Sequence, residues 1–429
     1  MKSSLNQKQR IMASALLALI LLPNLAFSQN EKQLSLEECY EKARDNYPLL
    51  RQMELIEQTK NYSVENISKG NIPQFNINGQ ATYQSDVTGL PVDIPNIIIE
   101  PLAKDQYKIY GEIVQPLTDF GTNSHQQAIA EANAEVESKN LEVELYQIKN
   151  RINQLFFGIM LVDGQLLQTA LLKKDIQTGL DRANAGIANG IALKSDADQL
   201  KAEMLNADQK TVEMEANRKA FMDMLSIFIG EELDENTQLI PPAPRELDDE
   251  INRPELASFA AQKESFVLQS ELVNKRNNPH FNLFFQGGYG RPGLNFLSND
   301  FEFFYVTGLR LNWNISNFYT SSREKEIIQL NQNAVQLQEE TFLLNTNLAM
   351  TQQKQDVLKY LKLLQTDDEI ITLREKVKTT ANNQLEYGSI TANDYLMYVN
   401  AEDQARQNQV LHRIQLLMAQ YTYQLTTGN

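Results

Sequence analysis

The sequence predicts a mostly α-helical chain that carries two pairs of membrane strands and is built from one unit used twice. The first observation is an internal repeat: PQFN at residues 73–76 returns as PHFN at 279–282, an offset of 206 residues. The second is a run of 70 residues, from Phe318 to Tyr387, without glycine or proline, which favours one very long helix. The third is the alternation of apolar and polar residues in four segments, which is typical of strands with two different faces.

The first 28 residues have the layout of a secretory signal peptide. Three basic residues precede an apolar run at 11–22, and a proline and the small-residue pattern AFS follow it. This arrangement predicts cleavage before Gln29 and export of the mature chain. Cleavage removes three basic residues and no acidic one, so the formal net charge of −16 becomes −19.

The first copy of the repeated unit covers residues 29–230. Helices are expected at 34–70, 121–186 and 195–229, and strands at 74–84 and 106–114. Beyond its first residue the long helix contains four glycines, which lower helix propensity and allow a bend. Cys39 is the only cysteine, so no intrachain disulfide can form and a small buried thiol is the expected state.

The second copy covers residues 254–429. Helices are expected at 254–277, 318–386 and 391–427, and strands at 280–290 and 301–314. Beyond the strands the offset falls to 198, which pairs Phe120 with Phe318 and Gly190 with Gly388. The loop between the strands of the second copy is therefore eight residues shorter. Residues 231–253, with PPAP at 241–244, separate the copies as a linker.

The long helices exceed what a compact domain can hold. A continuous helix of about 70 residues spans on the order of 100 Å. Apolar residues recur at the three-and-four spacing of a coiled-coil seam, at Ile327, Leu330, Ala334, Leu337, Leu344 and Leu348. After the helix, Gly388 suits a turn of positive φ, and Thr391 with Asp394 has the spacing of a capping box. Each copy is expected to form two antiparallel helices joined by a tight turn.

The four strands are about as long as the 9 to 11 residues that a tilted membrane strand requires. Aromatic residues near their ends are expected at the membrane interface: Tyr107, Tyr110, Phe120, Trp313, Phe318 and Tyr319. Two amphipathic hairpins packed on a soluble core would alternate in the same way, but the long helices favour the membrane. Because about eight strands are the smallest number that closes a barrel, each chain contributes a share: two chains supply eight strands, and three supply twelve.

Several classes of function are excluded. A strongly acidic exported chain repels nucleic-acid phosphates, and beyond the signal peptide no stretch approaches a membrane helix of 18 to 20 apolar residues. The three histidines have no His or Cys partner at ligand spacing, so no metal or other cofactor is expected. Neither a phosphate-binding loop nor a nucleophile motif is present, and we predict that the chain is not an enzyme.

Two motifs extend this picture to a known family. LSLEECYEKARDNYPLLRQ at 34–52 and LEYGSITANDYLMYVNAE at 385–402, together with the duplicated layout, resemble the TolC family of outer-membrane efflux proteins. The resemblance covers nearly the whole mature chain. It implies a homotrimer with a twelve-stranded barrel in the outer membrane, continuing into an α-helical tunnel that crosses the periplasm. It also implies docking onto a periplasmic adaptor and an inner-membrane pump that supplies the energy.

The same resemblance implies functional positions at the periplasmic tip. The adaptor-contacting turns would be Asn189, Gly190 and Ile191 in the first copy and Tyr387, Gly388 and Ser389 in the second. An acidic constriction would contain Asp196 and Asp394, although acids at a helix N-terminus are also favoured by the helix dipole alone. The family's second constriction aspartate corresponds to Met397, and the arginine and tyrosine that lock its closed tip correspond to Ile390 and Leu385.

Three functions are compatible with these features. The first is a passive exit duct for small molecules, the second is a duct for secreted polypeptides, and the third is an exported coiled-coil scaffold or adhesion protein. Oligomeric state and location separate the third from the other two.

Overall fold

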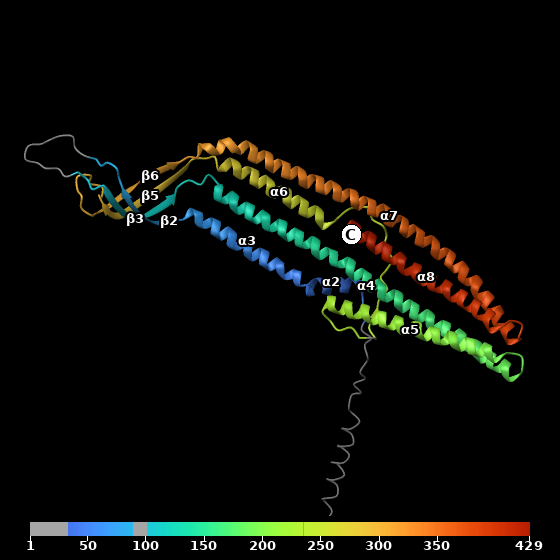
Figure 1. Ribbon diagram of the computed structural model, residues 1–429. Helices are drawn as coiled ribbons and strands as arrows, with labels where there is room; N and C mark the ends of the chain where they lie inside the picture. The colour runs from blue at the N-terminus through green and yellow to red at the C-terminus, as the bar shows by residue number, and fades with distance from the viewer. Residues whose placement is uncertain (1–32, 89–100, 235) are drawn as a thin grey trace, which may run out of the picture.

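The computed structural model describes residues 33–88, 101–234 and 236–429, and the predicted signal peptide lies outside this range. The molecule is elongated: the sheet lies at one end, and the turns that join the long helices lie at the other (Figure 1). The C-terminus lies near the middle of this length. The predicted fold class, long helices combined with antiparallel strands, is confirmed.

All four long strands form one antiparallel sheet in the order β2-β3-β5-β6. They are β2 (Gln74–Tyr83), β3 (Asp105–Pro116), β5 (His280–Arg291) and β6 (Glu302–Asn312). The middle pair, β3 and β5, joins the first copy of the unit to the second, with Ile113 opposite Phe285. Because β2 and β6 each pair on one side only, the sheet has two open edges within the described chain.

The segment before β2, where the sequence predicted helices over residues 34–70, is divided. It consists of α2 (Leu36–Asn46), the short 3-10 helix η1 (Pro48–Arg51), α3 (Gln52–Ser68) and a second 3-10 helix, η2 (Lys69–Asn71). The division falls at Pro48, which has no N–H to donate and disfavours helical geometry in the residue before it; Tyr47 is extended, with ψ 124°.

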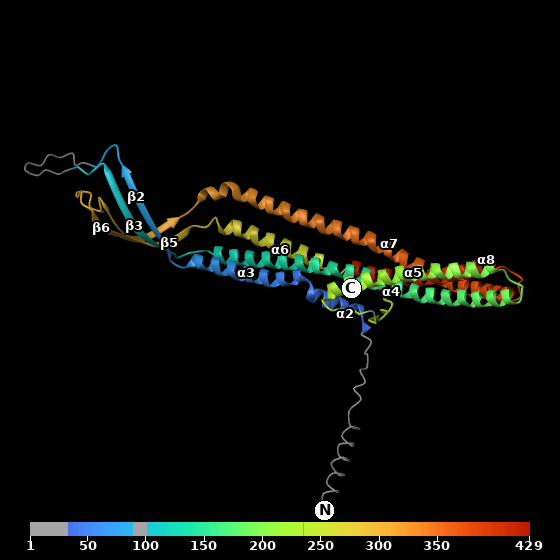
Figure 2. The same cartoon turned by 60° about the horizontal axis from the view of Figure 1, so that its bottom comes forward.

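The long helices form two antiparallel hairpins. The first contains α4 (Thr122–Ala188) and α5 (Lys194–Ile229), and the second contains α7 (Phe318–Glu386), after the short η3 (Ile315–Asn317), and α8 (Ala392–Thr427). The linker contributes β4 (Gln238–Leu239), which pairs in parallel with β1 (Gln33–Leu34), and α6 (Pro254–Lys275) follows it. The two hairpin turns remain together in a second view (Figure 2).

The four glycines of α4 do not interrupt the helix, which runs unbroken for 67 residues. Gly179 instead permits close packing: a Cβ there would lie 2.5 Å from Cε1 of Tyr395 on α8. The absent side chain therefore lets an aromatic ring approach the α4 backbone.

The main core lies where α2, α4, α5 and α8 meet. Ile152, Phe156 and Ile159 of α4 are fully buried there, and Cys39 is buried among them, as expected for a structural thiol. One 18-residue window of α4 is apolar enough to cross a membrane by length and composition, contrary to our expectation. The middle of α4 nevertheless contributes its largest apolar side chains to this protein core.

Apolar residues recur at three-and-four spacing on α7 and also on α8, and the two sets have different environments. On α8, Ile414, Leu417 and Tyr421 are buried within the chain. On the first half of α7, the seam residues Ile327, Leu330, Leu337, Leu344 and Leu348 remain 58–64% exposed. The α7 seam thus lacks a covering helix within the described residues of its own chain.

Candidate functional site: the sheet faces and the helical tip

One face of the sheet is apolar over its whole width. Strand register places Ile77, Gly111, Gly287 and Tyr305 in one row across the four strands. The most exposed side chains of this face are Phe75, Ile77, Tyr83, Phe303, Tyr305 and Leu309, at 69–87% exposure. Aromatic contacts such as Tyr289 with Phe303, at 4.8 Å between ring centroids, join neighbouring strands.

The opposite face is polar and carries a bridge between three strands. Glu112 of β3 accepts hydrogen bonds from Nε2 of Gln286 at 2.8 Å and from Nη2 of Arg310 at 2.9 Å. Since side chains alternate along a strand, these three residues share the face that also carries Asn76 and Asn282. The sheet therefore has the two-sided character that its alternation predicts.

Two phenylalanines, Phe284 and Phe304, lie on this polar face. The ring of Phe284 lies beside Gly308 on the next strand, where a Cβ would be 3.3 Å from Cε1 of the ring, and Arg310 stacks over it at 4.5 Å. Phe304 lies against Gly288, and the ammonium of Lys108 is 4.5 Å from its ring centroid. A neighbouring glycine and a basic side chain cover each ring, which accommodates apolar groups on a polar surface.

Five of the six predicted interface aromatics are exposed. Tyr107, Phe120, Trp313, Phe318 and Tyr319 are 44–80% exposed, at the ends of strands or at the start of the helices. Tyr110 differs, because its register opposite Gly288 places it on the polar face, where Lys108 is 5.4 Å from its ring. The alternation along β3 directs residues 108, 110 and 112 to the polar face, so Tyr110 is not on the apolar face of the sheet.

At the other end of the molecule, the predicted tip turns close both hairpins. Gly190 and Gly388 have φ of 73° and 69°, a left-handed geometry that costs a side-chain-bearing residue about 1 kcal/mol or more. Asn189 and Tyr387 are the last half-helical residues before them. The following N–H groups of Ile191 and Ser389 donate back to Gly186 and Gln384, at 2.9 and 2.8 Å, which completes the same cap in each copy.

The two tips contact each other within one chain. A Cβ on Gly388 would lie 3.6 Å from the backbone oxygen of Ile191. Nearby, Arg182 of α4 pairs with Glu386 of α7 at 2.9 Å and donates to the backbone oxygen of Asn382 at 2.6 Å. The two turns thus form one composite surface, on which the side chains of Ile191 and Tyr387 are 56% and 80% exposed.

The predicted acids cap the returning helices. Asp196 accepts from the backbone N–H of Leu193 at 3.0 Å. Asp394 accepts from the Thr391 hydroxyl at 2.8 Å and from its N–H at 3.1 Å; these hydrogen bonds lower the pKa of Asp394. The capping interpretation explains both positions structurally. Their role in a constriction stays a prediction.

Three positions at the tip depart from the family's pattern: Leu385 and Ile390, where the family has the residues that lock its closed tip, and Met397, where it has a second constriction aspartate. Leu385 and Ile390 pack against a small core that contains Ile176, Leu200 and Tyr395, whereas Met397 is 56% exposed.

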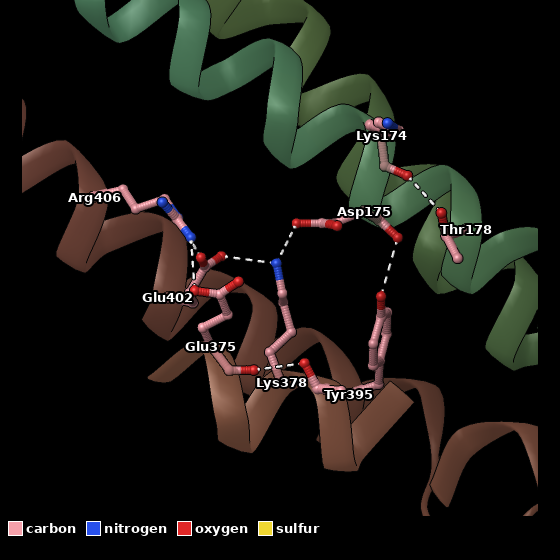
Figure 3. A network of polar contacts seen from close by, with 9 residues as sticks. Lys174, Asp175, Thr178, Glu375, Lys378, Tyr395, Glu402 and Arg406 are labelled. Carbon is pink, nitrogen blue, oxygen red and sulfur yellow. Dashed lines mark hydrogen bonds and ion pairs between the residues drawn. The ribbon is translucent and has the colours of Figure 1, made fainter. Parts of the chain in front are cut away.

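A polar network further along the helices was missed by sequence reasoning. Lys378 of α7 contacts Asp175 of α4 at 2.8 Å and Glu402 of α8 at 3.1 Å (Figure 3). Glu402 also pairs with Arg406, and the Tyr395 hydroxyl donates to the backbone oxygen of Asp175 at 3.1 Å. The Glu402 side chain is only 4% exposed. The network therefore ties the first hairpin to the second through a buried carboxylate.

Electrostatics of this region favour a charged lysine. Burial alone would lower the pKa of Lys378, but hydrogen bonds and charge from Asp175 and then Glu402 raise it above its ordinary value. Only the spacing of Glu402 and Arg406, four residues apart, was visible in the sequence as a helical ion pair. Lys378 and Asp175 lie 203 residues apart, so no local pattern predicted their contact.

No group of three or more potential metal ligands occurs among the described residues. A model of the family described as "Outer membrane efflux protein" matches residues 39–226. This match covers 188 of the 429 residues, and that part of the chain is similar to the outer membrane efflux protein family. The resemblance proposed from the two motifs is thereby confirmed, and this family consists of transport channels and not enzymes.

Solved structures agree with the outer membrane efflux protein fold. CusC matches with a TM-score of 0.68 at 11% identity, over 91% of this chain and 91% of that one. The outer membrane protein VceC of Vibrio cholerae matches with a TM-score of 0.67 at 12% identity, over 92% and 96%. The MtrE outer membrane channel of Neisseria gonorrhoeae, in its open state, gives 0.63 at 13% identity, over 92% and 89%.

No curated protein matches the sequence significantly. Among these solved structures, CusC is described in connection with transmembrane channel formation, and MtrE is described as an outer membrane channel.

Proposed function

We propose that this protein is the outer-membrane exit duct of a tripartite efflux system and that three copies form it. The observation that carries the proposal is the sheet of four strands with an apolar face, a polar face and two open edges. Lipid cannot satisfy the N–H and C=O groups of an open edge, and four strands cannot close a barrel. Three copies supply twelve strands, with the apolar face toward lipid and the polar face toward a water-filled lumen.

The helices support the same assembly. The exposed seam on α7 offers Leu337 and Leu344 to a helix outside the chain, and a neighbouring copy is the partner that a symmetric trimer supplies. The 69 residues of α7 span on the order of 100 Å. Three pairs of hairpins side by side would then continue the barrel as a tunnel through the periplasm.

The tip is the surface proposed to meet a periplasmic adaptor, which connects the duct to an inner-membrane pump. Exposed Ile191 and Tyr387 project from a rigid double turn, and apolar or aromatic residues on such a surface are suited to protein contact. The duct conducts passively in this proposal, and the pump supplies the energy.

Export by the predicted signal peptide at 1–28 is part of the proposal, as is the division into repeats at 29–230 and 254–429.

Cargo separates the main proposal from its alternative, a duct for secreted polypeptides. A deletion strain that accumulates dyes or toxic small molecules but secretes proteins normally supports small-molecule efflux. The reverse result supports the polypeptide duct. The third possibility, a coiled-coil scaffold, is disfavoured by the family assignment and by the two-sided sheet.

The assembly itself is tested with the full chain extracted from membranes in detergent. Light scattering is expected to give the mass of three chains, and planar bilayers are expected to show discrete channels. A monomer that fractionates with soluble periplasmic proteins and forms no channel would refute the duct.

A further inference from the structure

A small cavity lies halfway along the molecule, where α2 and α4 meet the residues that precede α6. Its volume is 280 Å³, slightly below the range of pockets for drug-sized ligands. Tyr40 and Arg44 reach it from α2, and Tyr146 and Lys149 reach it from α4. The two α2 residues are four apart and the two α4 residues are three apart, so each pair lies on one face of its helix. The cavity is therefore lined by two aromatic and two basic side chains.

Lys149 is held in the cavity without a negatively charged partner. Its ammonium is 4.9 Å from the ring centroid of Tyr146 and 5.5 Å from that of Tyr40. No carboxylate among the described residues lies within ion-pair distance of Lys149 or of Arg44. Burial, and then the charge of Arg44, lower the pKa of Lys149. Two neighbouring cations without a counterion are unusual in a chain of net charge −16.

The other polar groups around the cavity are already engaged. The Tyr40 hydroxyl donates to Asn153, and the Tyr146 hydroxyl donates to the backbone oxygen of Leu425 at 3.0 Å. Glu142, a carboxylate in the lining, is bound by Lys139 at 3.2 Å. The donors that remain available are therefore the two cationic groups.

We propose that this cavity is an oxyanion-binding site, in which Arg44 and Lys149 bind a carboxylate or phosphate group between the rings of Tyr40 and Tyr146. A guanidinium presents two parallel N–H donors that match an oxyanion, and an ammonium adds a point charge. The tyrosine faces hold the ammonium in place and leave one side of it for the ligand. The oxyanion has two sources: a small solute of the periplasm, or an acidic side chain of a neighbouring copy of this chain.

The test measures how fast an amine-specific acylating reagent modifies Lys149 in the purified full-length protein, read by peptide mass spectrometry. Inorganic phosphate or acetate is added at constant ionic strength, with chloride as the balancing anion. A solute site predicts saturable protection of Lys149. Lys263, which pairs with Glu339 at 2.7 Å, is the internal control and should keep its rate.

Variants distinguish a site from general salt effects. Arg44→Gln should weaken the apparent affinity for phosphate by about tenfold or more, because the charge-assisted hydrogen bonds of the guanidinium are lost, and Arg44→Lys should restore part of it. Lys42→Gln removes the same charge from the same helix, where Lys42 pairs with Glu231 at 2.8 Å, and should leave the affinity unchanged.

A zero-length carbodiimide cross-linker identifies the second source. If a neighbouring copy supplies the carboxylate, Lys149 resists modification without added anion and forms an amide cross-link to an acidic residue of another subunit. Rapid modification of Lys149 that neither anion slows, together with no cross-link, overturns the proposal. Either result leaves the channel assay unaffected, so failure here is distinguishable from failure of the proposed duct.

Discussion

At the scale of single residues, the most consequential positions bridge the two hairpins or cap them. Lys378 forms ion pairs with Asp175 of the first hairpin and Glu402 of the second, and the Glu402 side chain is 4% exposed. Breaking a buried ion pair by removing one partner costs far more than the pair contributes, because an uncompensated charge remains. Residues of this network should therefore affect stability more strongly than the many surface ion pairs of the helices.

We expect Lys378→Met to destabilise the folded chain by on the order of 3 kcal/mol and to raise the open probability of the channel, because the hairpins lose their link. Thermal unfolding in detergent and planar-bilayer recording measure the two effects. Lys359→Met is the matched control: Lys359 pairs within one helix with Asp356 at 2.7 Å, and such exposed pairs contribute little to stability. Equal effects of both variants would contradict the role of the network.

Asp403 on α8 provides a pH-dependent prediction. Burial raises its pKa from 3.8 to about 6, opposed by the charge of Lys210. The folded state then binds a proton more tightly than the unfolded state, so this group destabilises the fold as pH rises from about 4 through about 6.

Asp403→Asn should therefore raise the melting temperature relative to the native protein at pH 8. The difference should shrink toward zero as the pH falls to 4, where Asp403 is protonated. Calorimetry across this range measures it, and a difference that does not depend on pH would argue against a raised pKa.

Asp196 and Asp394 can be tested for charge separately from capping. Asn retains an oxygen that accepts the N-terminal hydrogen bonds, so the double variant Asp196→Asn, Asp394→Asn removes charge while preserving the caps. If the acids form a constriction, cation selectivity falls, which a reversal potential in a salt gradient detects. Unchanged selectivity and conductance would leave both residues as helix caps alone.

At the scale of elements, the long helices depend on close contacts as much as on helix propensity. Gly179 weakens α4 locally, yet it admits the ring of Tyr395, which is 2% exposed and tied by its hydroxyl to Asp175. The proline at 48 acts in the opposite way, because it separates α2 from the helical turn that begins at Pro48.

Gly179→Ala tests this balance. Alanine improves helix propensity by about 1 kcal/mol, but its Cβ would lie 2.5 Å from the Tyr395 ring, and overpacking typically costs about 1–3 kcal/mol. We expect a lower melting temperature than for Gly158→Ala, where the nearest atom is the edge of the Phe221 ring at 3.3 Å. A stabilised Gly179→Ala protein would show that the ring moves aside freely.

At the scale of the whole molecule, a single chain leaves surfaces exposed that need a partner. Its sheet has open edges, and its α7 seam is exposed. The covering surface must come from outside the chain, and in the proposed assembly a second and a third copy supply it.

Charge on this seam should oppose assembly. The double variant Leu337→Lys, Leu344→Lys is expected to dissociate the trimer on dilution. Each leucine side chain that becomes buried in the interface contributes about 1.5–3 kcal/mol to assembly. Gln338→Lys adds charge beside the seam, at an exposed position, and should leave the trimer intact. Light scattering reports the mass, and circular dichroism verifies that the separated chains remain helical; an unchanged trimer mass would remove this seam from the interface.

The sequence by itself determined the features that depend on local pattern. The repeat offset, the run without glycine or proline, the alternation in four strands and the turn glycines predicted the fold class, and the motifs predicted the family. These predictions from local pattern hold because helix period, strand alternation and positive φ are properties of neighbouring residues.

Only the tertiary structure decided which distant groups meet. It joined β3 to β5, placed Tyr110 on the polar face, and covered Phe284 with Arg310 beside Gly308. It also brought Lys378 to Asp175, and Arg44 to Lys149. Such contacts depend on how helices and strands that are separate in the sequence pack against each other, and no local periodicity records that packing.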